Sequence, residues 1–349
     1  MQNLTRFLTR LGILPLLVFL GSCDMVLLDP SGDIALQQRN LIYTAVGLML
    51  LIVVPVIIMT LVIAWKYRAS NTEAEYDPDF HHSTKLEFVV WGAPIAIILA
   101  LGAVTWVATH KLDPYRPLER IDASTPLPDN VRPLTIEVVA LDWKWLFFYP
   151  EQGIATVNEL AAPVNVPIHF KITGTTTMNS FFIPALAGQI YSMPGMQTQL
   201  NAVINREGVY KGMSANLSGR GFSHMNFKFH GVSAGGFDEW VAKVKADGDT
   251  LDRPRYVELA KPSEKEPVRY FAAADPELYD AILNRCVEEN KICMRDIMHI
   301  DALGGGGIKG IDKEEALRLG LCTPATPFGS AALSPVSEDT DKNGEKKAI

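Results

Sequence analysis

Two long uncharged runs lie in the first third of the chain. Residues 41–65 and 88–109 contain no Asp, Glu, Lys or Arg, and each exceeds the roughly 20 apolar residues that a helix needs to cross a bilayer. Pro55 and Pro94 fall inside these runs, as membrane helices tolerate when neighbouring helices satisfy the freed carbonyls. The pattern predicts a two-helix transmembrane hairpin. Two uncharged runs of this length disfavour the alternative, a buried hairpin of a soluble protein.

From about residue 130 the pattern changes to short apolar runs, several of which alternate with polar positions. Gly, Pro and Asn separate them, which predicts a compact β-sandwich or barrel. The runs that we predict as strands are 133–141, 144–149, 167–172, 180–183, 198–204 and 225–229. After Gly236 the apolar positions take a helical period, which predicts helices over 237–246 and 276–294. The Ser-, Pro- and charge-rich residues from 323 onward predict a disordered tail.

The N-terminus is typical of a bacterial lipoprotein signal. Arg6 and Arg10 precede a short apolar run over 11–20, which is too short for a comfortable membrane span. Residues 20–23 then resemble a lipobox, so Cys23 is the predicted site of lipid attachment after removal of residues 1–22. The alternative is an uncleaved helix with an incidental cysteine. A cleaved signal would place the loop over 66–87 in the cytoplasm and everything after Thr109 in the periplasm, and the cations of that loop agree with this orientation.

Composition narrows the function only slightly. The 349 residues carry a net charge of −7 and no long basic run, which argues against nucleic acid as a partner. Three cysteines, Cys286, Cys293 and Cys322, fall in the predicted periplasmic part, where disulfides form. On a continuous helix Cys286 and Cys293 would have Cα atoms about 10 Å apart, too far for a bridge. We therefore expect Cys322 to pair with one of them.

Several motifs then occur in a fixed order. Residues 142–149 place Trp143 and Trp145 at the head of an aromatic run, and the segments 178–184, 193–196, 208–212 and 214–225 follow. Together they resemble subunit II of the haem-copper oxidases, and the resemblance covers about residues 23–246. It implies a membrane-anchored α+β protein: a transmembrane hairpin, a cupredoxin-like Greek-key β-sandwich and a helical C-terminal extension.

The segment 214–225 decides the expected chemistry. In cytochrome c oxidases this loop and an upstream histidine bind a dinuclear copper centre, through two cysteines, two histidines, a carbonyl and a methionine. Aligned on the resemblance, the histidine positions are Asn179 and Phe222, the cysteine positions are Ser214 and Ser218, and only the methionine remains, as Met225. Two close copper ions need soft anionic sulfur bridges, which neutral hydroxyls do not provide. The resemblance therefore implies that the copper site is lost.

His224 and His230 lie near Met225 and raise the alternative of a surviving mononuclear copper site. On an extended strand His224 and Met225 would point to opposite faces, and no thiolate lies between Cys23 and Cys286. We therefore expect no metal in this chain, and ordinary surface or half-buried histidines.

A lipobox combined with replaced copper ligands resembles subunit II of the bo-type ubiquinol oxidases. This resemblance implies a proton-pumping terminal oxidase of the bacterial inner membrane, in which quinol electrons pass directly to haem in subunit I. Haem and copper are then expected in subunit I alone, with subunits I, III and IV and membrane lipid as partners and no cytochrome c. This chain would act structurally as a periplasmic cap, with Trp143 and Trp145 as core or interface aromatics. Residues 276–294 resemble the extra C-terminal region of that family less closely.

Glu87 matches the family position near the entrance of a proton path into subunit I. A carboxylate at a membrane boundary can collect protons, whereas the alternative is an acid that favours the dipole of the second helix.

The expected organisation has five parts: 1–22 signal peptide, 23–120 hairpin, 121–250 periplasmic cupredoxin-like domain, 251–322 helical region and 323–349 tail. Two rival functions remain, a copper-bearing electron carrier of a cytochrome c oxidase and a free-standing lipoprotein that binds a ligand or partner.

Overall fold

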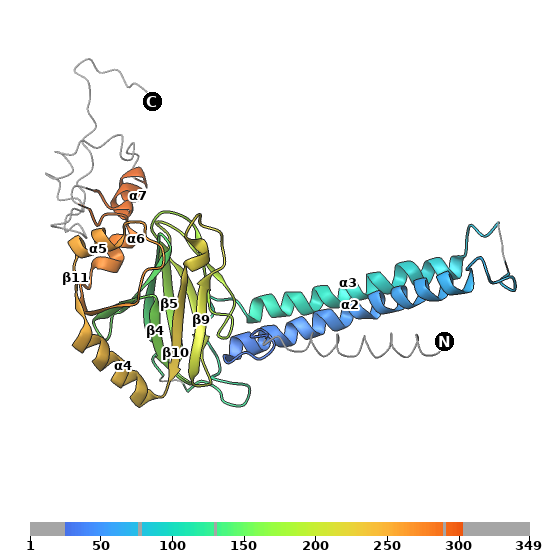
Figure 1. The fold of residues 1–349 in the computed structure, drawn as a ribbon, viewed down its shortest axis with the longest axis horizontal. Coiled ribbons are helices and arrows are strands. Elements are labelled where there is room, and N and C mark those ends of the chain that lie inside the picture. The colour runs from blue at the N-terminus through green and yellow to red at the C-terminus, as the bar shows by residue number, and fades with distance from the viewer. Residues whose placement is uncertain (1–24, 76–78, 129–130, 289–290, 303–349) are drawn as a thin grey trace, which may run out of the picture.

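The computed structural model describes residues 25–75, 79–128, 131–288 and 291–302. A long helical hairpin projects from a β-sandwich, and shorter helices cover the side of the sandwich away from the hairpin (Figure 1). Lipid attachment at Cys23 and the tail over 323–349 lie outside the described residues.

The hairpin consists of α2 (Asp33–Lys66) and α3 (Thr84–Lys111), which lie side by side (Figure 1). They contain the two predicted uncharged runs, and both are long and apolar enough to cross a membrane. With 34 residues, α2 is about 51 Å long, well beyond the roughly 30 Å of bilayer hydrocarbon. Its first eight residues, before the uncharged run begins at Leu41, therefore remain available to contact the sandwich.

The sandwich has two sheets. The seven-stranded sheet has the order β11-β12-β3-β2-β1-β5-β8, and the five-stranded sheet has the order β4-β10-β9-β6-β7. The strands are β1 (Leu134–Leu141), β2 (Lys144–Tyr149), β3 (Ile154–Val157), β4 (Glu159–Pro163), β5 (Pro167–Gly174), β6 (Asn179–Phe182), β7 (Ile190–Ser192), β8 (Thr198–Val203), β9 (Gly208–Ser214), β10 (Asn226–Val232), β11 (Asp249–Leu251) and β12 (Arg269–Ala274). The predicted sandwich class is confirmed.

Strand β2 is buried on both faces because a hydrophobic layer covers each side of its sheet. Trp145, Phe147 and Tyr149 point between the two sheets. Leu146 and Phe148 point the other way, toward the C-terminal extension. This alternation follows from the two-residue period of a strand. The extension therefore packs on the outer face of the sheet and completes a second hydrophobic core there.

The C-terminal extension is only partly helical. It comprises α4 (Ala234–Asp247), α5 (Arg253–Leu259), α6 (Leu278–Leu283) and α7 (Met294–Ala302), interrupted by β11 and β12. Strand β12 pairs antiparallel with β3. Without β12, strand β3 would be an open edge of the sheet. The prediction of a helix over 237–246 is confirmed by α4.

The predicted continuous helix over 276–294 is wrong. Arg285 has φ 58°, a left-handed conformation that ends a helix, and α7 begins only at Met294. The Cα atoms of Cys286 and Cys293 lie 4.8 Å apart, and the two residues form a disulfide. The expectation that Cys322 pairs with one of them is therefore also wrong, since it assumed an unbroken helix.

The junction between hairpin and sandwich is held by polar contacts. Asp33, at the start of α2, is 4% exposed, and Arg120 donates to both of its carboxylate oxygens at 2.9 and 3.0 Å. Gly32 lies against backbone: a Cβ there would stand 2.6 Å from the carbonyl oxygen of Leu186 and 2.7 Å from that of Val203. The hairpin therefore enters the domain in one defined orientation.

Candidate functional site

The last residue of β9 and the loop between β9 and β10 contain four of the five positions that the resemblance aligns with copper ligands. These antiparallel strands pair from Gly208↔Gly231 to Met213↔Asn226, and the backbone N–H of Ser214 donates to the Met225 carbonyl oxygen at 3.1 Å. The loop therefore leaves and re-enters the sheet at one point.

Asn179 and Ser214 meet inside the domain although 35 residues separate them. Strand β6 pairs with β9, with Phe181 opposite Ser214. The Ser214 hydroxyl donates to Asn179 Oδ1 at 3.1 Å and also lies 3.3 Å from the Asn216 carbonyl oxygen. Both side chains are buried, at 2% and 4% exposure. A neutral hydrogen bond thus joins the positions where the resemblance expects a histidine and a cysteine in copper-binding relatives.

The remaining three positions differ in their surroundings. The carbonyl oxygen of Ser218 accepts a hydrogen bond from Trp143 Nε1 at 2.9 Å, while its buried hydroxyl has no hydrogen-bond partner among the described residues. Phe222 starts the short 3-10 helix η1 (Phe222–His224) and is half-buried. Met225 is 1% exposed and belongs to the core between the sheets.

Trp143 determines how the loop rests on the domain. It occupies the turn between β1 and β2 with φ 64°, and the loop packs on its indole. A Cβ at Gly221 would stand 2.4 Å from Cδ2 of that ring. Gly219, with φ +101°, lies against the other part of the ring and adopts a conformation that other residues rarely take. Sequence reasoning missed both glycines, and their spacing about Arg220 was the available signal.

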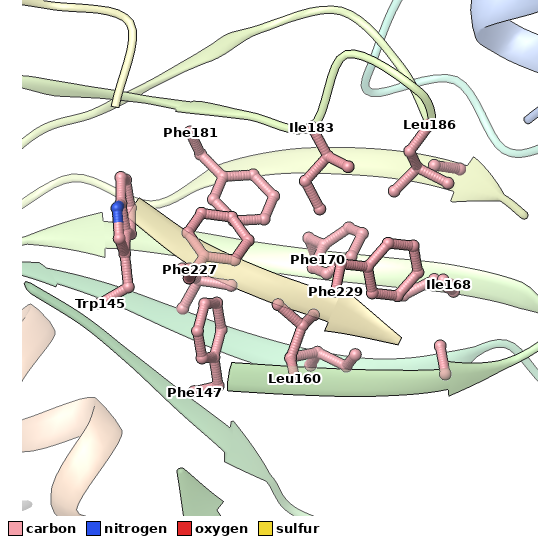
Figure 2. Close-up of a cluster of buried hydrophobic side chains, with 14 of the residues drawn as sticks. Trp145, Phe147, Leu160, Ile168, Phe170, Phe181, Ile183, Leu186, Phe227 and Phe229 are labelled. Atoms are coloured by element: carbon pink, nitrogen blue, oxygen red, sulfur yellow. The ribbon is translucent and has the colours of Figure 1, made fainter. Parts of the chain in front are cut away.

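An aromatic cluster lies beneath the loop. Phe181 and Phe227 stack at 5.4 Å, and Trp145 meets both rings edge-on at 5.4 and 5.7 Å. Figure 2 shows Trp145 at one end of this cluster, with Phe147 beside Phe227. Trp145 is fully buried and Trp143 partly buried, which agrees with their expected role as core and interface aromatics.

The side chains at this site do not fit a dinuclear copper centre. Ser214 supplies a neutral hard oxygen that is already hydrogen-bonded to Asn179, and a phenyl ring cannot bind a metal. Among the described residues, no group of three or more His, Cys, Asp or Glu side chains is placed to hold a metal ion. His224 belongs to η1 rather than to the predicted strand and is exposed, while Met225 is buried, so the two side chains do not face a common site.

A second polar cluster joins the sandwich to the C-terminal extension. Glu159 on β4 accepts hydrogen bonds from Tyr270 Oη at 2.5 Å and Trp240 Nε1 at 3.4 Å. His230 Nε2 lies 3.5 Å from its other oxygen. The pKa of Glu159 is lowered to about 2, chiefly by the contact with His230 and further by the hydrogen bonds from Tyr270 and Trp240. Burial is the main reason that the pKa of Tyr270 is raised, so the pair keeps a charged acceptor and a protonated donor.

Glu87 lies at the opposite end of the hairpin from the sandwich, in the first turn of α3 (Figure 1). His82 Nδ1 stands 2.7 Å from Glu87 Oε1, and both side chains are more than half exposed. His82 Nε2 lies 3.2 Å from the hydroxyl oxygen of Thr84. The structure therefore pairs the predicted proton-entry residue with a histidine that sequence reasoning did not single out.

Comparison with known proteins agrees with this geometry. The family model described as the periplasmic domain of cytochrome c oxidase subunit II matches residues 151–232, and the model of the oxidase aromatic-rich motif matches residues 245–290. The cytochrome bo(3) ubiquinol oxidase subunit 2 of Pseudomonas aeruginosa is 55% identical over 275 residues, covering 79% of this chain and 80% of that protein. The protein of the same name from Pseudomonas putida is 52% identical, covering 80% and 87% of the two chains. The ubiquinol oxidase subunit 2 of Acetobacter aceti is 51% identical, covering 78% and 87%.

The chain belongs to the ubiquinol oxidase subunit II family. In this family member, the cupredoxin-like sandwich carries the loop over 214–225, and the aromatic-rich motif covers residues 245–290 of the C-terminal extension, which contribute to the second core. The membership expected from the ordered motifs is confirmed.

Proposed function

We propose that this chain is the structural subunit II of a proton-pumping terminal ubiquinol oxidase. The observation that carries the proposal is the loop over 214–225. It returns to the sheet at Met225, yet a hydrogen bond between Ser214 and Asn179 stands where thiolate and imidazole ligands would be needed. Relatives named as ubiquinol oxidase subunits share about half of the sequence, which favours the quinol oxidase over a copper-bearing electron carrier.

Without a copper relay, electrons would pass from ubiquinol to subunit I directly. Haem and copper would then reside in subunit I, where oxygen is reduced to water, and this chain would need no cofactor. Its sandwich would cap the periplasmic face of subunit I, and α2 and α3 would pack against that subunit and its partners III and IV. The exposed apolar side chains around α2 and α3 agree with such packing, because a single hairpin cannot cover them itself.

The membrane placement follows from the hairpin. We place α2 and α3 in the bacterial inner membrane, with the sandwich in the periplasm and the loop between the helices in the cytoplasm. Residues 1–22 would be removed as a signal peptide and Cys23 acylated. An acyl chain contributes about 0.8 kcal/mol per buried methylene, but two spanning helices already anchor the chain, so the lipid should be dispensable for insertion.

Glu87 would serve as a proton-entry residue on the cytoplasmic side. Its position in the first turn of α3, exposed and paired with His82, suits a group that collects protons from water. The pairing also agrees with a purely local role at a helix start. The proposal is therefore tested by the turnover of a Glu87 variant and not by the geometry.

One purification tests the whole proposal. The complex is isolated in mild detergent through a tag on this chain, and oxygen uptake is compared with ubiquinol and with reduced cytochrome c. We expect haem to copurify and uptake to occur with ubiquinol only. Uptake with cytochrome c would favour the electron carrier, and haem-free inactive material would favour a free-standing lipoprotein.

A further inference from the structure

An exposed apolar turn precedes the hairpin. Met25, Val26 and Leu27 are 55%, 45% and 51% exposed, and the turn over residues 26–28 directly follows Met25. The backbone N–H groups of Leu28 and Asp29 both donate to the Met25 carbonyl oxygen, at 2.8 and 3.3 Å. Three adjacent apolar side chains are thus presented outward by a closed turn.

The turn is fixed to the sandwich. Arg206 Nη2 binds the Asp29 carboxylate at 2.9 Å and the Pro30 carbonyl oxygen at 2.6 Å. The backbone N–H of Gly32 donates to the Ala185 carbonyl oxygen at 2.8 Å. The outward position of the apolar triplet is therefore set by the folded domain and does not depend on a lipid at Cys23.

The turn also lies beside the part of α2 that approaches the membrane. Arg39 Nη1 donates to the Leu28 carbonyl oxygen at 3.5 Å. Arg39 is six residues beyond Asp33, which is about 9 Å further along the helix, and the uncharged run begins two residues later, at Leu41. The Arg39 guanidinium also stands 5.9 Å from the ring centre of Tyr43, an arrangement typical of the lipid headgroup level.

We infer that the side chains of Met25, Val26 and Leu27 are immersed in the periplasmic leaflet of the membrane, as a non-covalent anchor that sets the depth of the sandwich. The occupant of this surface is lipid, with Arg39 at the level of the phosphates. Two observations support this inference. The turn lies beside the start of the uncharged part of α2, and it is fixed rigidly to the domain. It rests on the membrane placement of α2 proposed above.

Site-directed nitroxides on the intact complex in phospholipid nanodiscs test the inference. The label is placed at Leu27→Cys in a Cys322→Ser background, and the same background without a new cysteine is the blank. Val26→Cys replaces Leu27→Cys if that variant fails to assemble. Collisions with oxygen, which concentrates in lipid, are compared with collisions with a water-soluble nickel chelate. A label at Leu217→Cys, a side chain 76% exposed in the loop between β9 and β10, is the aqueous control.

We expect the ratio of oxygen to nickel collisions at position 27 to be several-fold higher than at position 217. The ratio should be unchanged when Cys23→Ser removes the acylation site. A ratio at position 27 equal to that at 217 would overturn the inference, as would shielding from both reagents, which would mean that a partner subunit covers the turn. A third label at Ile57→Cys, inside α2, separates the two proposals, because nickel access there would refute the membrane placement itself.

Discussion

Replacing Glu159 with glutamine should loosen the C-terminal extension. The carboxylate lies on β4 and accepts hydrogen bonds from Tyr270 on β12 and Trp240 on α4. Both donors belong to the extension, and His230 lies on β10, so Glu159 is a charged contact that joins β4 to β10 and to the extension. Gln keeps the shape and one acceptor oxygen, but it removes the charge and places an NH2 group where the other oxygen was.

The expected loss follows from the pKa of this carboxyl. Its pKa falls from an ordinary 4.5 to about 2, chiefly through the contact with His230, and at 1.36 kcal/mol per pKa unit this corresponds to roughly 3 kcal/mol. The side chain is 11% exposed, so solvent screens the charge only weakly. Because the His230 contact lies within the sandwich and glutamine still accepts from Tyr270, we expect the extension itself to lose about 1 to 1.5 kcal/mol.

Hydrogen exchange in the purified complex measures this loss directly. At pH 7, amides of residues 245–290 should exchange roughly 5- to 13-fold faster in Glu159→Gln than in the wild type, if they exchange through local opening. A carboxyl with a lowered pKa stabilises the fold fully above its unfolded value of 4.5, and this contribution is lost as the pH falls through about 2. The difference between the two proteins should therefore shrink below pH 4.5.

Glu137 on β1 provides a control of opposite sign. Burial raises the pKa of its carboxyl, with Lys171 only partly offsetting the effect, so Glu137→Gln should leave exchange unchanged or slow it. Exchange in Glu159→Gln within a factor of about two of the wild type would refute the reasoning, and so would equal acceleration in both variants.

Three further perturbations test other parts of the molecule. Glu87→Gln should slow oxygen uptake by roughly tenfold, equivalent to about 1.4 kcal/mol of barrier, with normal haem content; uptake at the wild-type rate would remove Glu87 from proton entry, and His82→Asn then reports whether the paired histidine matters. Cys286→Ser with Cys293→Ser should cost the extension about 2.5 kcal/mol, from the chain entropy of an eight-residue closed loop, as measured by denaturant unfolding of the complex; an unchanged midpoint would show that packing alone holds the loop. Restoring thiolates and imidazoles should create copper binding with thiolate-to-copper absorption, whereas colourless protein after copper addition would mean that the loop is not shaped for the centre; the substitutions are Asn179→His, Ser214→Cys, Ser218→Cys and Phe222→His.

The sequence predicts those elements whose own residues carry the pattern. Strand β2 has its predicted bounds, because a run of aromatics between turns leaves little choice. Strands β3 and β4 were missed, since both are buried on both faces and show no alternation. The break at Arg285 was missed for a different reason: it depends on a left-handed residue and a disulfide between Cys286 and Cys293, which a helical apolar period does not reveal.

One part of the candidate site could be predicted from the sequence, and another part could not. Resemblance places Asn179 and Ser214 in one site although they are distant in sequence, and the structure brings them to 3.1 Å. The role of Gly221 could not be predicted, because it depends on the Trp143 indole arriving from another turn. The Glu159 cluster could not be predicted either, because its donors Trp240 and Tyr270 belong to the C-terminal extension, far from Glu159 in the sequence.

We propose that electrons bypass this chain because it has no copper relay. Two separate anaerobic rapid-mixing experiments test this most directly. The oxidised complex is mixed with ubiquinol in one and with reduced cytochrome c in the other, and haem reduction is followed in both. The account predicts haem reduction within the turnover time by ubiquinol and none by cytochrome c. Haem reduction by cytochrome c at a rate that supports turnover would contradict it.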